Sequence, residues 1–129
     1  MANPERQQAP QSGLLRQRAA SFGHAFRGVA VALRSELHLR FHAAATVVVL
    51  GLGFYCQITR LEWALVALAV AGVWTAELLN TAIEALTDLA SPNYHELAGK
   101  AKDVAAGAVL LAALGALAVG LLIFGPRFF

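Results

Sequence analysis

Charged residues are scarce in this chain, and residues 104–124 contain none. Of the 129 residues only 14% are charged while 58% are hydrophobic, a composition outside the range of ordinary soluble domains. The formal net charge is +2, and no basic stripe with interleaved aromatic residues is present, so nothing supports a nucleic-acid partner. We therefore expect at most one domain, which lies in a membrane.

Cysteine is nearly absent, and Cys56 alone can form neither an intrachain disulfide nor a thiolate metal cluster. The first forty or so residues hold no apolar run, which argues against a secretory signal peptide, and we expect the chain not to be cleaved. A phosphate-binding loop is excluded as well. Gly23 and Gly28 have its spacing, but Val29 and Ala30 follow where lysine and serine or threonine are required.

The N-terminal part is basic, because six of the ten lysines and arginines lie before Phe41. Residues 1–20 contain prolines, glutamines and arginines without periodicity and are expected to form a flexible cytoplasmic tail. Residues 21–39 predict a helix that lies on the membrane surface, with Ser21 as its N-cap. Its apolar residues form one stripe, made of Phe22, Phe26, Val29, Leu33 and Leu37. Glu36 falls inside this stripe, where an acidic residue is unexpected.

Three apolar runs follow, at residues 41–58, 63–90 and 104–124, and each is long enough to cross a lipid bilayer as a helix. Positively charged residues gather before the first run and at Lys100 and Lys102, between the second and third. The positive-inside rule therefore places the N-terminus and residues 91–103 in the cytoplasm. The predicted fold is all-α, with a surface helix and three membrane spans.

The second span carries polar residues on one face of its helix, at Glu77, Asn80, Thr81, Glu84 and Asp88. An unpaired carboxylate at the depth of Glu77 costs about 3 kcal/mol, so it needs a partner or a purpose. One purpose is to accept a proton. Asp88, nearer the end of the helix, is as well explained by a solvated helix end.

Residues beside this face suit phosphoryl transfer from a nucleotide. Glu36 and Glu84 could supply oxygens to Mg²⁺, which takes one or two carboxylates and completes its shell with phosphate and water. Lys102 precedes the predicted start of the third span, where free N–H groups favour an anion, and Asp103 is a candidate N-cap. A carboxylate deeper in the lipid indicates a lipid hydroxyl as the acceptor. The alternatives are a small proton- or ion-coupled transporter and a structural membrane subunit.

The segments "ELLNTAIEALTDL" and "AKDVAAGAV" resemble the signature of the small bacterial integral-membrane lipid kinases, the prokaryotic diacylglycerol kinases and undecaprenol kinases. The resemblance runs from about Phe22 to the end of the third span. It implies a homotrimer in the cytoplasmic (inner) membrane of a bacterium, with active sites between subunits, ATP as the phosphoryl donor and Mg²⁺ as the cofactor.

The resemblance also implies roles for individual residues. Glu77 is expected to be the general base, with Asn80 orienting it or the substrate, and Glu36 and Glu84 are expected to be linked to the metal. The residues expected to bind the nucleotide are Glu36, Glu84, Asn93, Tyr94, His95, Lys102, Asp103 and His24. Those expected to bind the lipid are Arg27, Glu77, Arg40 and His42.

Two histidines depart from the family pattern, His24 where tyrosine is usual and His38 where many members have asparagine. The stretch "SELHLRFH" keeps Glu36 and His42 at the spacing of the undecaprenol kinase branch. We therefore expect ATP-dependent phosphorylation of undecaprenol to undecaprenyl phosphate. Diacylglycerol, phosphorylated to phosphatidic acid, is the alternative acceptor.

Overall fold

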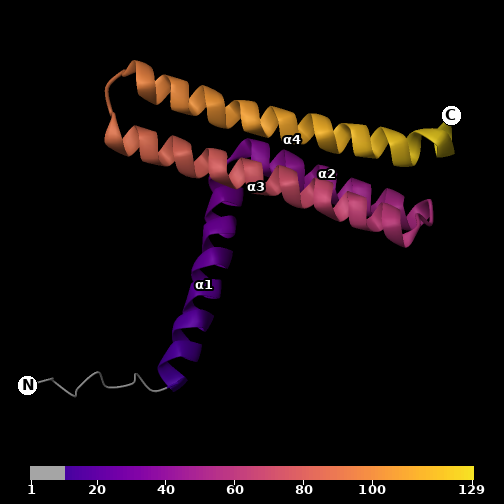
Figure 1. Ribbon diagram of the computed structural model, residues 1–129, viewed down its shortest axis with the longest axis horizontal. Helices are drawn as coiled ribbons and strands as arrows, with labels where there is room; N and C mark the ends of the chain where they lie inside the picture. Colours follow the sequence, from indigo (N-terminus) through magenta and orange to yellow (C-terminus); the bar gives the residue numbers. More distant parts are fainter. Residues whose placement is uncertain (1–10) are drawn as a thin grey trace, which may run out of the picture. The chain divides into compact units, whose positions relative to one another are not determined.

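The computed structural model describes residues 11–129, with side chains from Gly13 onward, and contains no strand in that range. Its four helices are α1 (Gln11–Ser35), α2 (Leu37–Tyr55), α3 (Arg60–Ala90) and α4 (Glu96–Phe128) (Figure 1). The chain divides after Val31, and the unit Ala32–Phe129 contains α2, α3 and α4. The predicted all-α fold is confirmed.

Helices α2, α3 and α4 are long and apolar enough to cross a membrane. At 1.5 Å per residue they measure about 28, 46 and 50 Å, against about 30 Å for the hydrocarbon core of a bilayer. The predicted three helices that could each span a membrane are thus confirmed, although their boundaries differ. Helix α2 begins before Phe41, and α4 begins eight residues before Val104 because its polar first turns are also helical.

Helix α1 begins at Gln11 rather than at Ser21. Ser21 is not an N-cap, because it lies within α1 and its exposed hydroxyl donates to the carbonyl of Gln17, at 3.0 Å. The predicted tail is therefore helical over residues 11–20, while residues 1–10 lie outside the described part of the chain. That α1 lies on a membrane surface stays a prediction.

Glu36 does not belong to the helical stripe in which the sequence places it. It separates α1 from α2 in an extended conformation, with φ −104° and ψ 118°, and it occupies the N-cap position of α2 without a side-chain capping bond. Its N–H still donates to the carbonyl of Ala32 at 2.9 Å. This carboxylate therefore lies at the junction between two helices.

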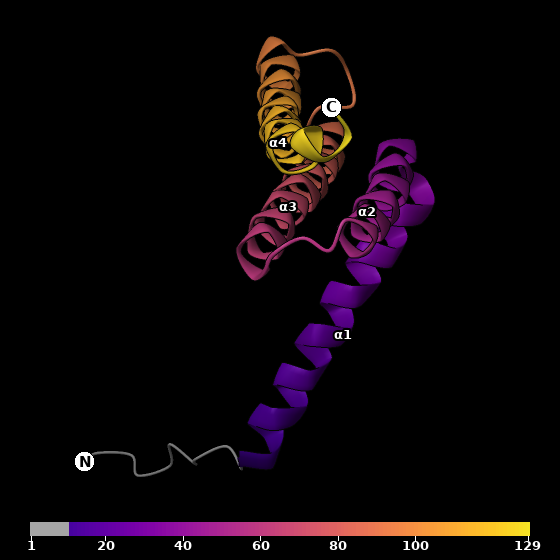
Figure 2. The same cartoon turned by 90° about the vertical axis from the view of Figure 1, so that its right-hand side faces the viewer.

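Helix α3 packs along α4 and, over a shorter stretch, against α2 (Figure 1). The view in Figure 2 shows α2 and α4 against different sides of α3. We call the region where α2 ends, α3 begins and α4 ends the closed end. Its buried residues are Ile58, Val66, Ile123 and Phe124. A β-carbon at Gly53 would lie 2.6 Å from the Trp63 ring. Glycine at this position therefore allows α2 and α3 to approach each other closely.

Polar groups also tie the closed end together. Thr59 and Glu62 form a capping box at the start of α3, with bonds of 2.7 and 3.3 Å. Glu62 also pairs with Arg127 of α4 at 2.9 Å, and Arg127 donates to the carbonyl of Ile123. The start of α3 is thereby held to the end of α4.

Candidate active site

One stripe of α3 changes from apolar to acidic along the helix. Val66, Val73 and Glu77 are the buried residues of α3, and Glu77 is only 5% exposed. Glu84 and Asp88 continue the stripe at the next positions of the same face. The face that packs against the other helices therefore leads from the hydrophobic core to a row of carboxylates.

Glu77 is paired with His42 of α2. The distance from His42 Nε2 to Glu77 Oε1 is 3.0 Å, and the side chain of His42 is 20% exposed. One turn along α2, the Thr46 hydroxyl donates to the carbonyl of His42 at 2.7 Å. The indole N–H of Trp74 donates to that same hydroxyl oxygen at 3.1 Å. Two polar links, one turn apart, thus hold α2 to α3 beside the buried carboxylate.

Asn80 and Glu84 form the next step of the acidic face. The amide nitrogen of Asn80 donates to Glu84 Oε1 at 3.0 Å. The Asn80 carbonyl oxygen is buried and has no hydrogen-bond partner among the described residues. Glu84 lies about 10 Å along the helix from Glu77. A buried acceptor without a partner calls for a donor or a cation, because leaving it unpaired costs free energy.

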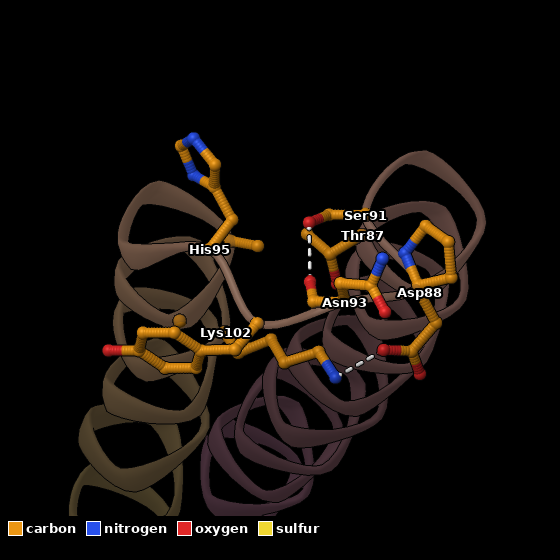
Figure 3. Close-up of a pocket in the computed structure, with 10 residues that line it drawn as sticks. Thr87, Asp88, Ser91, Asn93, His95 and Lys102 are labelled. Atoms are coloured by element: carbon orange, nitrogen blue, oxygen red, sulfur yellow. Dashed lines mark hydrogen bonds and ion pairs between the residues drawn. The ribbon is translucent and has the colours of Figure 1, made fainter.

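The last turn of α3, the following loop and the first turns of α4 form a region that we call the open end. These segments line a pocket of about 240 Å³. Lys102 donates to Asp88 at 2.5 Å across it, and the Ser91 hydroxyl donates to the carbonyl of Asn93 at 2.8 Å (Figure 3). The pocket is lined by Thr87, Asp88, Ser91, Pro92, Asn93, Tyr94, His95, Ala98, Gly99 and Lys102.

Four of the residues predicted to bind a nucleotide meet in this pocket, namely Asn93, Tyr94, His95 and Lys102. Tyr94 is 92% exposed. His95 caps α4, since its Nδ1 accepts from the N–H of Leu97 at 3.2 Å, and its ring is turned away from Asp88 and Lys102 (Figure 3). Asp88, which the sequence left between two interpretations, is the partner of Lys102.

Asp103 is not an N-cap, and this prediction is wrong. Helix α4 already begins at Glu96, so both Lys102 and Asp103 lie inside it, and Asp103 is exposed and does not line the pocket. The first N–H groups of α4 belong instead to the residues that follow His95, and the N–H of Leu97 is already bonded to His95.

The other residues predicted to bind the nucleotide, the metal or the lipid do not line this pocket. Glu36 is half-buried, and Arg40 is exposed. His24 and Arg27 are exposed on α1, in the unit before Ala32. Over residues 11–129, no three side chains of histidine, cysteine, aspartate or glutamate are close enough together to hold a metal ion.

Thr46 and Trp74 were missed by sequence reasoning. The available signal was faint, a hydroxyl and an indole N–H inside otherwise apolar runs. The same two residues lie at one end of an apolar groove of about 390 Å³ between α2 and α3. The groove is lined by Thr46, Leu50, Trp63, Val66, Ala67, Val70, Ala71 and Trp74.

Comparison with known proteins relates this chain to lipid kinases. A sequence model of prokaryotic diacylglycerol kinase matches residues 23–124. Undecaprenol kinase of Bacillus subtilis (strain 168) is 46% identical over 107 residues, which are 83% of this chain and 87% of that protein. Diacylglycerol kinase of Synechocystis sp. is 43% identical over 101 residues, 78% of this chain and 58% of that protein.

Diacylglycerol kinase of Escherichia coli (strain K12) is more distant, with 32% identity over 90 residues, which are 70% of this chain and 74% of that protein. The matched residues 23–124 contain α2, α3, the open end and most of α4. The buried Glu77, the acidic face of α3 and Lys102 therefore all lie in the matched part. This chain belongs to the prokaryotic diacylglycerol kinase family.

Proposed function

We propose that this protein transfers the γ-phosphoryl group of ATP to the hydroxyl of a membrane lipid alcohol. Undecaprenol is the proposed acceptor, in line with the 46% identity to an undecaprenol kinase. Diacylglycerol is the alternative, since relatives at 43% and 32% identity are diacylglycerol kinases.

The observation that carries this proposal is the buried carboxylate of Glu77 in an apolar helix. Glu77 Oε1 is bonded to His42, which leaves Oε2 for the acceptor hydroxyl. In the proposed step the hydroxyl proton passes to Glu77 as the lipid oxygen forms a bond to the γ-phosphorus. The bond between that phosphorus and the bridging oxygen of ADP breaks, so no covalent enzyme intermediate is needed.

The nucleotide is proposed to bind at the open end. Lys102 and the loop 91–95 provide donors for phosphate oxygens, and the exposed ring of Tyr94 can cover a base. Asp88 lies about 16 Å along α3 from Glu77, and Glu84 lies between them. A chain of phosphates extending along this face would bring its terminal group toward Glu77. Nucleotide binding by Asp103 and His24 stays a prediction, as does lipid binding by Arg27.

Mg²⁺ is the proposed cofactor, and the donor set of α3 fits it. Glu84 Oε1 is held by Asn80, the other carboxylate oxygen remains free, and the buried Asn80 oxygen has no partner among the described residues. Oxygen donors of this kind are the ligands that Mg²⁺ prefers. Glu84 and Glu36 would hold the ion, which when bound offsets negative charge on the phosphates.

We also propose that three copies assemble in the cytoplasmic membrane with active sites between them. Large apolar side chains of α2, α3 and α4 are exposed, and lipid or a neighbouring copy must cover them. Small residues along α4, among them Ala112, Ala116 and Gly120, suit close helix packing. The N-terminus and the loop 91–95 are placed on the cytoplasmic side, as the distribution of basic residues predicts.

The deciding experiment uses purified protein in lipid micelles with labelled ATP and Mg²⁺. Undecaprenol and diacylglycerol are offered in parallel, and Glu77→Gln serves as the comparison because it keeps the size of the side chain but cannot accept a proton. We expect label in undecaprenyl phosphate, with the rate falling at least about 100-fold in Glu77→Gln.

Preference for diacylglycerol would keep the mechanism and replace the acceptor. Transfer to neither lipid, or full activity in Glu77→Gln, would contradict the proposal. Mixing Glu77→Gln with Arg27→Ala subunits tests the shared site, because Arg27 lies in the unit that precedes the helices carrying Glu77 and Lys102. If each site draws on two copies, mixed assemblies regain activity that neither variant has alone.

A further inference from the structure

We propose that His42 is the positioning residue of Glu77: it holds one carboxylate oxygen so that the other faces the acceptor hydroxyl. This rests on the proposed function, and it changes the role of His42 from binding the lipid to orienting the base. The contact that supports it is the 3.0 Å distance between His42 Nε2 and Glu77 Oε1, at a carboxylate that is 5% exposed.

His42 is the partner that the described residues provide for Glu77, which forms no ion pair with lysine or arginine there. The chemistry of a base explains why a histidine suits this place. A permanent cation such as guanidinium would hold the carboxylate ionised and weaken its hold on a proton. An imidazole N–H that donates to Oε1 restrains that oxygen, while Oε2 stays able to accept the proton. No proton leaves His42.

The position of His42 is itself fixed. Thr46, one turn further along α2, bonds to the carbonyl of His42 and accepts from the indole of Trp74. Trp74 lies one turn before Glu77 on α3, so the two links between the helices form a closed ring of contacts. The bond between Trp74 and Thr46 holds α2 against α3 beside the His42–Glu77 bond, which favours one orientation of the buried carboxylate.

The kinetic test compares His42→Leu, which removes the donor, with His42→Gln, whose side-chain amide keeps an N–H. We expect kcat for lipid phosphorylation to fall about 100-fold in His42→Leu, the loss typical of a reacting group displaced by about 1 Å. KM for ATP and for the lipid should stay close to the wild-type values. His42→Gln should recover most of the lost kcat. His38→Leu is the matched control, since His38 is exposed one turn earlier on α2 and forms no side-chain bond among the described residues.

Three kinetic outcomes would overturn the proposal. A raised KM for the lipid with unchanged kcat would show that His42 contacts the acceptor. Equal losses in His42→Leu and His42→Gln, with lowered melting temperatures, would show a purely structural role. Wild-type kcat in His42→Leu would show that Glu77 needs no positioning.

A spectroscopic test is independent of lipid phosphorylation. In protein labelled with ¹⁵N-histidine and held in lipid nanodiscs, Glu77→Gln should shift the imidazole nitrogen signals of His42 and leave those of His38 in place. If the wild-type protein phosphorylates neither lipid, the proposed function fails, and this shift still reports whether the pair exists. An unmoved His42 signal in an active enzyme would refute the pairing while leaving the proposed function intact.

Discussion

The closed end and the open end carry ion pairs between the same two helices, α3 and α4. At the closed end the side chains of Glu62 and Arg127 are 23% and 30% exposed, whereas at the open end those of Asp88 and Lys102 are 68% and 38% exposed. Both contacts are short, at 2.9 and 2.5 Å. The pairs therefore differ in their surroundings rather than in their distances.

Those surroundings indicate what each pair is for. The closed end adds a capping box, a buried apolar cluster and the close contact between Gly53 and Trp63. The open end adds a pocket lined by both polar and apolar residues, and it has no buried apolar cluster among the described residues. An exposed ion pair contributes little to stability, so keeping Lys102 beside a cavity makes sense if its charge is used on a ligand. The closed end holds α3 and α4 together, and the open end remains available to a ligand.

The sharpest test of this comparison exchanges each cation for methionine. Lys102→Met should lower kcat/KM for ATP by about 100- to 1000-fold, the loss typical of removing a charge-stabilising donor, while the melting temperature hardly changes. Arg127→Met should do the reverse, because Arg127 holds Glu62 and the carbonyl of Ile123 but lies far from the pocket. Kinase assays and thermal melting of both variants measure this. Loss of activity in Arg127→Met without loss of stability would break the distinction between the ends.

A second prediction concerns packing at the closed end. In Gly53→Ala the added carbon would lie 2.6 Å from the Trp63 ring, so the ring or the helix must shift. We expect a loss of about 1–3 kcal/mol in the free energy of unfolding, as for other overpacked sites. Gly51→Ala is the control, because nothing lies within 4 Å of a side chain there. Denaturation in mixed micelles compares the two, and equal stabilities would mean that the closed end is loosely packed.

The smallest expected effect is at Gln57, in the turn between α2 and α3, whose φ of 49° is in the left-handed region. Gln57→Gly relieves this strain but makes the unfolded chain more flexible, so the two effects nearly cancel and the change should stay within about 1 kcal/mol. Gln57→Val should be clearly destabilising, because a branched side chain fits that conformation poorly. Melting temperatures of the two variants test this prediction. A Gln57→Val variant more stable than the wild type would contradict the left-handed conformation at Gln57.

Much of this architecture follows from the sequence, because long apolar runs and a 3.6-residue period leave few alternatives. The three spans and the shared face of Glu77, Glu84 and Asp88 depend only on the geometry of a single helix. The helix starts were harder to predict. Asp103 has the stronger capping preference, yet α4 begins after His95 because the residues between them, except Gly99, are good helix formers.

Contacts between helices could not be predicted in the same way. No glycine or proline marks the break at Glu36, so its departure from the apolar stripe could not be predicted from the residue types. The pairing of His42 with Glu77 depends on the register of α2 against α3, which neither helix specifies alone. The sequence alone could assign His42 and Glu77 to one site, but it could not predict that their side chains form a pair.

The length of α3 determines where the two proposed substrates can meet. Glu77 is about 25 Å from the start of the helix and Asp88 about 42 Å, so a hydrocarbon layer of about 30 Å would cover the first and leave the second in water. A lipid alcohol could then react without being drawn out of the bilayer, which would cost about 0.8 kcal/mol for every methylene group exposed. A nucleotide could likewise react without shedding the water around its base and sugar. Each reactant would remain in its own solvent, and only the phosphoryl group would cross the boundary.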